Sequence, residues 1–105
     1  LRVWQDEHSD SHGTLLESVK FGGHSVELWH WQLAPGTVYD AEPDPAGSHE
    51  MLYVISGELV LTLNGEVRPL VTGTSICFAS DQAYRYHNPG PFLLRFSKNV
   101  LLSME

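Results

Sequence analysis

Residues 49–68, HEMLYVISGELVLTLNGEVR, decide the fold of this chain. The segment reads as two strands broken at Ser56-Gly57, followed by Asn64-Gly65, the dipeptide most typical of a two-residue β-hairpin turn. A third strand then begins. Both faces of the first strand are largely apolar, so we expect it to be central in a sheet and covered on both sides. Its first inward-facing side chain is nevertheless a carboxylate, Glu50.

The remainder of the chain also carries short apolar segments separated by turn residues. We expect strands over residues 1–4, 14–21, 24–34, 75–79, 83–87 and 92–98, a brief pairing at 38–39, and a last strand or a ragged end over 99–105. Pro69 lacks a backbone donor, which favours an edge position. No segment has convincing helical periodicity. Nine or ten short strands with frequent turn signals predict one all-β domain over residues 1–105.

Composition excludes several classes of function. The chain has 105 residues and a formal net charge of −7, which argues against nucleic-acid binding by this segment alone. No apolar run approaches a membrane span, and no signal peptide is visible, so we expect a cytoplasmic location. The chain begins at Leu1 without an initiator Met, which suggests that it is part of a longer protein. The single Cys77 lies in an apolar run, and we expect a buried, inert thiol.

Two spaced motifs resemble those of the cupin family. The first family motif ends with a Glu, six residues and a Gly, matched here by Glu50 and Gly57. The second begins with a Gly and ends with an Asn, matched by Gly73 and Asn88. The resemblance covers about residues 33–98 and implies a double-stranded β-helix, which is a jelly-roll barrel.

The metal-binding positions of the family are poorly matched. Cupin metal sites typically combine two His and a Glu of the first motif with a His of the second. Here the His-x-His position falls within residues 42–46, which contain no His, and Tyr84 replaces the last His. We therefore expect no metal cofactor. The remaining alternative is an all-oxygen site for a hard ion such as calcium or manganese. Its ligands would be Glu42, Asp44, Glu50 and Tyr84.

A narrower resemblance concerns function. The Leu33-Ala34-Pro35-Gly36 turn, the acidic loop and residues 47–59 resemble the C-terminal cupin of bacterial regulators whose N-terminal helix-turn-helix is of the XRE type. In those proteins the barrel is usually taken to sense a small molecule. The resemblance implies a sensor domain, with DNA bound only through a separate N-terminal domain.

The sequence also indicates which residues would bind such a ligand. A buried carboxylate must be paired, hydrogen-bonded or protonated, so Glu50 contacts a ligand, pairs internally with Arg85, Arg95 or Arg68, or is exposed at the mouth of the barrel. Tyr84 and Tyr86 share one strand face and offer apolar rings with polar tips. The predicted ligand-binding residues are Glu50, Tyr84, Tyr86, Tyr39 and Leu52. Trp29 and Trp31 are expected in the core or at a dimer interface, and no catalytic residue is assigned.

We expect a homodimer formed through apolar outer faces that include Met51, Tyr53 and either Trp29 or Leu28. The leading function is a small-molecule-sensing domain of a helix-turn-helix transcriptional regulator. Two alternatives remain open. One is a free-standing cupin enzyme such as a dioxygenase, isomerase or lyase, which the missing His ligands disfavour. The other is a degenerate cupin that serves only for dimerisation.

Overall fold

The computed structural model describes residues 1–103, which form ten strands. Their bounds are β1 (Arg2–Gln5), β2 (His12–Phe21), β3 (His24–Leu33), β4 (Val38–Ala41), β5 (His49–Ser56), β6 (Glu58–Leu63), β7 (Glu66–Val71), β8 (Ser75–Ala79), β9 (Tyr84–His87) and β10 (Leu94–Ser103). The described residues contain no helix that could span a membrane.

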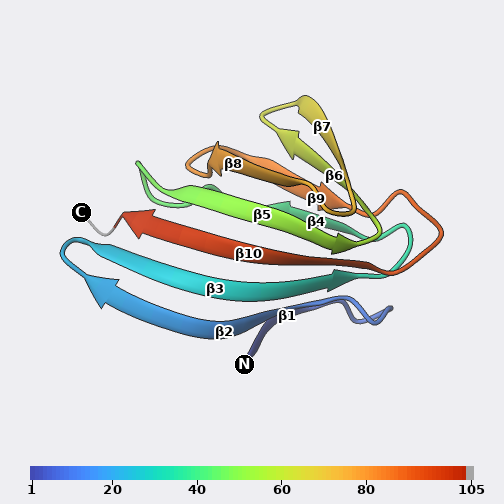
Figure 1. Ribbon diagram of the computed structural model, residues 1–105, viewed down its shortest axis with the longest axis horizontal. Coiled ribbons are helices and arrows are strands. Elements are labelled where there is room, and N and C mark those ends of the chain that lie inside the picture. Colours follow the sequence, from blue (N-terminus) through green and yellow to red (C-terminus); the bar gives the residue numbers. More distant parts are fainter. Residues whose placement is uncertain (104–105) are drawn as a thin grey trace.

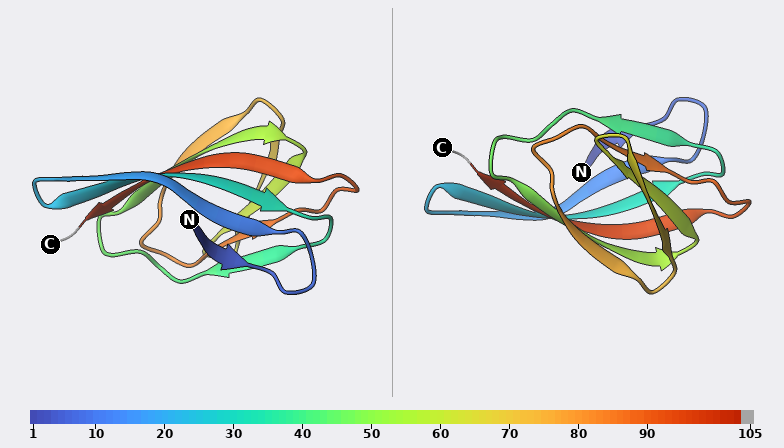
Figure 2. Two further views of the ribbon diagram at one scale, coloured as in Figure 1. Left: turned by 90° about the horizontal axis from the view of Figure 1, so that it is seen from below. Right: turned by 90° about the horizontal axis from the view of Figure 1, so that it is seen from above.

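Two antiparallel sheets face each other (Figure 1). The larger sheet has the order β1-β2-β3-β10-β5-β8 and the smaller has the order β4-β9-β6-β7. Figure 2 shows the β2–β3 hairpin extending past one end of the barrel. The all-β prediction is confirmed, and so is the edge position expected from Pro69, because β7 is the last strand of the smaller sheet.

The core lies between the two sheets, and strand alternation supplies it. In β5, Leu52 and Val54 point inward with Glu50 and are fully buried. Leu59 and Leu61 face them from β6. Asn88, at the end of the second motif, donates hydrogen bonds from Nδ2 to the carbonyl oxygens of Leu33 (2.9 Å) and Phe92 (2.8 Å) and so ties the loops at one end of the barrel.

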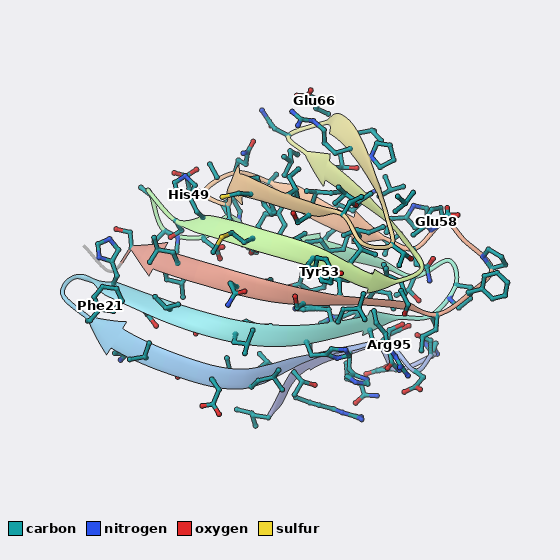
Figure 3. The ribbon with its side chains drawn as sticks, viewed as in Figure 1. Phe21, His49, Tyr53, Glu58, Glu66 and Arg95 are labelled. Carbon is teal, nitrogen blue, oxygen red and sulfur yellow. The ribbon has the colours of Figure 1, made fainter. Side chains whose placement is uncertain are left out.

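The outer face of the larger sheet is exposed, although the strand that begins at His49 was expected to be covered on both sides. β5 is central between β10 and β8, but only its inner face is covered, because Met51 and Tyr53 are 54% and 49% exposed. Figure 3 shows Tyr53 on the front of this sheet, with the smaller sheet behind. Cys77 is also exposed, which makes the buried-thiol prediction wrong. Alternation along β8 turns Phe78 inward and Cys77 outward.

The C-terminal segment forms one continuous strand rather than a strand followed by a separate end. β10 runs over Leu94–Ser103 and pairs with β3 on one side and with β5 on the other. Leu94, Phe96 and Val100 point inward at a period of two, and the inward position between them is Lys98. The polar residue interrupts the apolar alternation and obscures the length of the strand in the sequence.

Gly57 separates β5 from β6 and should tolerate substitution poorly. Its φ is +96°, and a Cβ there would lie 3.0 Å from both the Leu93 carbonyl oxygen and the Leu94 Cα. Gly57→Ala is therefore expected to lower the free energy of unfolding by about 2–3 kcal/mol in urea denaturation. Gly65→Ala is the matched control, since φ is +85° there but no atom lies within 4 Å of the added Cβ. Equal losses in the two variants would contradict the steric part of this account.

Candidate functional site

Glu50 is buried near the N-terminal end of β5 and accepts hydrogen bonds from two tyrosines. Its side chain is 1% exposed. The Tyr84 hydroxyl donates to Oε2 at 2.6 Å, and the Tyr86 hydroxyl donates to Oε1. Both tyrosines come from β9 in the opposite sheet. Tyr84 and Tyr86 therefore share one strand face, as expected from the sequence, and that face points into the barrel, where Glu50 links the two sheets.

The charged partner of Glu50 is Lys98. The pairing with Arg85, Arg95 or Arg68 that was considered from the sequence is wrong. Lys98 Nζ lies 3.7 Å from Glu50 Oε2, and both side chains are buried. Arg85 pairs instead with Asp40 at 2.6 Å on the exposed side of β9. Arg68 pairs with Glu66, and Arg95 is exposed. These arginines occupy outward positions of their strands, which removes them from Glu50.

Strand register places Lys98 beside Glu50. In the larger sheet, Val100 of β10 is paired with Glu50 of β5, so Lys98 is the diagonal neighbour of Glu50 on the inner face. On its other side Lys98 is paired with Trp29 of β3. Diagonal neighbours in a sheet lie within reach of long side chains. The signal available in the sequence was the inward position of Lys98 in an otherwise apolar alternation.

Aromatic rings surround the Lys98 amine. Nζ lies 4.8 Å from the ring centre of Trp29, 5.0 Å from that of Trp31 and 5.7 Å from that of Tyr86. A cation at these distances is attracted by the negative face of each ring. The Trp29 indole is oriented by a hydrogen bond from Nε1 to Glu27 Oε1 of 3.0 Å. Trp29 therefore faces the interior. Of the two residues considered for the outer face, Trp29 and Leu28, it is Leu28 that lies there.

A pocket of about 350 Å³ opens next to the Glu50–Lys98 pair. Its aromatic lining comprises all three tryptophans of the chain together with Tyr39 and Tyr84. Its charged lining comprises Glu27, Asp40, Glu42, Asp44, Glu50 and Lys98. Of the predicted ligand-binding residues, Glu50, Tyr84 and Tyr39 line this pocket, Tyr86 lies beneath Glu50, and Leu52 belongs to the packed core instead.

Glu50, Lys98 and the two tyrosines that contact Glu50 have pKa values shifted from their ordinary values. Burial raises the pKa of Glu50, against the opposing effects of Lys98 and the two tyrosine hydroxyls. Burial lowers the pKa of Lys98, while Glu50, Asp44 and Glu27 oppose the change. Burial and the Glu50 carboxylate raise the pKa of both Tyr84 and Tyr86. The two tyrosines therefore stay protonated as donors to Glu50.

The donors around Glu50 do not fit a metal ion. Glu42, Asp44, Glu50 and Tyr84 all line the pocket, but residues 1–103 contain no group of three or more His, Cys, Asp or Glu arranged to hold a metal. Both Glu50 oxygens already accept hydrogen bonds from tyrosine hydroxyls, and the Lys98 amine lies 3.7 Å from Oε2. A second cation beside Lys98 would be repelled. That the domain needs no metal stays a prediction.

Comparison with known proteins identifies the fold family. The model of the Cupin_2 family, described as a cupin domain, matches residues 29–99. The chain belongs to the cupin family. The match includes β4 to β9, the second half of β3 and the first part of β10, and so contains Glu50, both tyrosines and Lys98.

Cupin domains of bacterial regulators are among its relatives. The chain is similar to the Cupin_2 domain of an XRE family transcriptional regulator from Enterobacter cloacae, with 32% identity, a TM-score of 0.70, and coverage of 71% of this chain and 79% of that one. It is 34% identical over 65 residues to the HTH-type transcriptional regulator SutR of Escherichia coli (strain K12), a match that covers 62% of this cupin and 36% of that regulator. An HTH_3 family regulator from Vibrio cholerae shares the fold, with 20% identity, a TM-score of 0.72, and coverage of 88% of this chain and 50% of that chain.

Proposed function

We propose that this cupin is the small-molecule-sensing domain of a helix-turn-helix transcriptional regulator. The observation that carries the proposal is the pocket beside the buried Glu50–Lys98 pair. Small-molecule sites are typically concave, mostly apolar, and equipped with a few oriented polar groups. This pocket combines an aromatic wall with one carboxylate, one amine and one tyrosine hydroxyl. The similarity to regulator cupins supports the same reading.

Ligand binding would act through the loop at the mouth of the pocket. Residues 42–48 connect β4 to β5 and contribute Glu42, Pro43 and Asp44 to the lining. The same loop rests on the β8–β9 turn, because Asp44 N donates to the Ser80 carbonyl oxygen at 2.9 Å. A ligand shifts an equilibrium only if it binds one state better than another. Contacts to this loop would give a ligand that preference and pass it to neighbouring segments.

The expected homodimer would carry the signal to the DNA-binding domains. Met51, Tyr53 and Ile55 of β5 expose apolar surface on the outer face of the larger sheet. Pairing of two copies through this face would bury that surface, and a change in pairing would move attached helix-turn-helix domains. Dimerisation stays a prediction here, as does DNA binding through an attached domain.

A thermal-shift screen with small metabolites tests the proposal. A ligand at one hundred times its Kd should stabilise the domain by about 2.7 kcal/mol, which is roughly 10 °C or more for a domain of this size. Glu50→Gln and Tyr84→Phe should weaken binding by about tenfold or more, because each loses a buried hydrogen bond. Val67→Ser on the edge strand β7, an exposed position away from the pocket, is the control and should bind like the wild type.

The screen has a second stage in the full-length protein. A ligand that binds the pocket should change the affinity of the full-length regulator for its DNA, and Glu50→Gln should weaken that response. Hits that bind both pocket variants as tightly as the wild type would contradict the proposed site. Hits that bind the pocket and leave DNA binding unchanged would contradict the regulatory role.

A further inference from the structure

Lys98 is a buried amine that the hydrogen bonds of the barrel leave unsaturated. Its side chain is 7% exposed and lines the pocket. The polar contact found for Nζ within residues 1–103 is Glu50 Oε2 at 3.7 Å, which is longer than a hydrogen bond. Glu50 is itself held by Tyr84 and Tyr86. An ammonium group has three donors, so this amine keeps capacity for a partner that enters the pocket.

We propose that Lys98 captures a small, uncharged aromatic or apolar aldehyde in the pocket as a reversible imine. This inference rests on the proposed ligand-binding function and names the chemical class of the ligand. It assigns Lys98 the role of nucleophile and Glu50 the role of proton carrier. Lysine is suited to this role because its amine loses its proton readily when buried.

The reaction balances with groups that are already in the pocket. The Lys98 ammonium passes a proton to the Glu50 carboxylate 3.7 Å away. The free amine forms a bond to the carbonyl carbon, and the carbonyl oxygen takes up a proton from the attacking nitrogen. Glu50 then returns its proton to the hydroxyl group, which leaves as water, and the nitrogen becomes an iminium ion. The net change is ammonium plus aldehyde to iminium plus water, and no oxidant or reductant is needed.

The surroundings of Lys98 Nζ favour both the free amine that starts this reaction and the iminium ion that it produces. Before it, burial lowers the pKa of Lys98 and so increases the fraction of free amine. After it, the positive iminium nitrogen still lies over the faces of Trp29 and Trp31 and beside the Glu50 carboxylate. The same cation–π contacts that hold the ammonium therefore stabilise the product.

The lining selects the class of aldehyde. Trp4 stacks on Trp31 with ring centres 5.4 Å apart, and Tyr39 lies 4.7 Å from Trp31, which gives an aromatic wall. Glu27, Glu42 and Asp44 line the same pocket and repel anionic ligands such as keto acids or phosphorylated aldehydes. Lys98 opposes a second positive group placed next to its own nitrogen. An uncharged aldehyde with an apolar body meets none of these penalties.

The chain offers a sharp test because it contains only two lysines, Lys20 and Lys98. Benzaldehyde would be added with cyanoborohydride, which reduces an imine to a stable benzylamine, and the labelled residue would be located by peptide mass spectrometry. Lys20 is exposed on β2, so it reports ordinary lysine reactivity. Lys98 in the folded protein should be labelled in at least about tenfold excess over Lys20. Urea denaturation should abolish the excess.

Two variants complete the test. Lys20→Arg leaves the pocket unchanged and should keep full labelling at Lys98, whereas Lys98→Arg should lose it. Labelling of Lys98 that is no faster than that of Lys20 would overturn the imine. If metabolites bind the pocket without such labelling, this inference fails while the proposed sensor survives. If Lys98 is trapped but ligands leave DNA binding unchanged, the imine stands and the regulatory role fails.

Discussion

Replacing Lys98 with Met is expected to destabilise the domain by about 3–5 kcal/mol at pH 8, the usual cost of breaking a buried ion pair. The Met side chain fills a similar volume, so the loss comes mainly from charge. Without Lys98, Glu50 keeps the Tyr84 and Tyr86 hydroxyls but has no other cationic partner among residues 1–103. Chemical denaturation followed by tryptophan fluorescence measures the difference.

The loss in Lys98→Met should depend on pH in a defined direction. Burial already raises the pKa of Glu50 above its ordinary value of 4.5, and removing Lys98 removes the largest opposing effect. A carboxyl group with a raised pKa contributes stability below pH 4.5 that is lost as pH rises through the folded-state value. Burial also lowers the pKa of Lys98, and the stability that this costs the wild type is lost as pH falls from 10.5 to the folded-state value of Lys98. The gap between variant and wild type should therefore close towards pH 4.

A double variant separates charge from packing. Glu50→Gln in the Lys98→Met background removes the unpaired carboxylate, so it should recover much of the stability lost at pH 8 and show a flatter pH profile. If Lys98→Met is as stable as the wild type at pH 8, or equally destabilised at pH 4 and pH 8, the buried pair does not act as described.

Trp31→Ala is expected to cost about 3–5 kcal/mol, the range for removing a large aromatic side chain from a core. Trp31 is 1% exposed. Its ring packs against Tyr86 at 5.3 Å and Phe96 at 6.1 Å, as well as against the aromatic wall of the pocket. Calorimetry should show a lower Tm, and the remaining folded protein should bind ligands poorly because one wall of the pocket is missing.

Trp29→Ala is the matched control for Trp31→Ala. It removes the same side chain from the same strand and the same face two residues away, but Trp29 is only half-buried. Its loss of stability should be roughly half as large, or less, since the cost scales with the buried surface removed. A Trp29→Ala variant that is less stable than Trp31→Ala would contradict the placement of the core.

Much of the fold could be predicted from the sequence because its signals are local. Alternation in residues 49–63, the Asn64-Gly65 turn and the spacing from Glu50 to Gly57 led to the correct strands and family. What sequence reasoning missed depends on which face of a strand is covered. Cys77 lies in an apolar run, yet it faces outward from a sheet whose outer side is open in residues 1–103.

The part of the site that lies at motif positions could be predicted from the sequence, and the part set by pairing between distant strands could not. Glu50 and Tyr84 lie at motif positions, and alternation alone joins Tyr86 to Tyr84. The cation that pairs with Glu50 is set by register between distant strands, since Lys98 reaches Glu50 through the β5–β10 pairing. Arg85 and Arg95 were attractive by charge, but a position on the outer face excludes them. Period-two counting along residues 94–103 would have placed Lys98 inside.

The most direct test of the central claim uses the three tryptophans, all of which line the pocket. The indole N–H signals of Trp4, Trp29 and Trp31 would be followed by NMR while a ligand from the thermal-shift screen is titrated. We expect that at least the Trp29 and Trp31 signals shift and saturate together, and that Glu50→Gln weakens this response. A ligand that binds with all three indole signals unmoved would show that it binds elsewhere, and would contradict the assignment of this pocket as the sensing site.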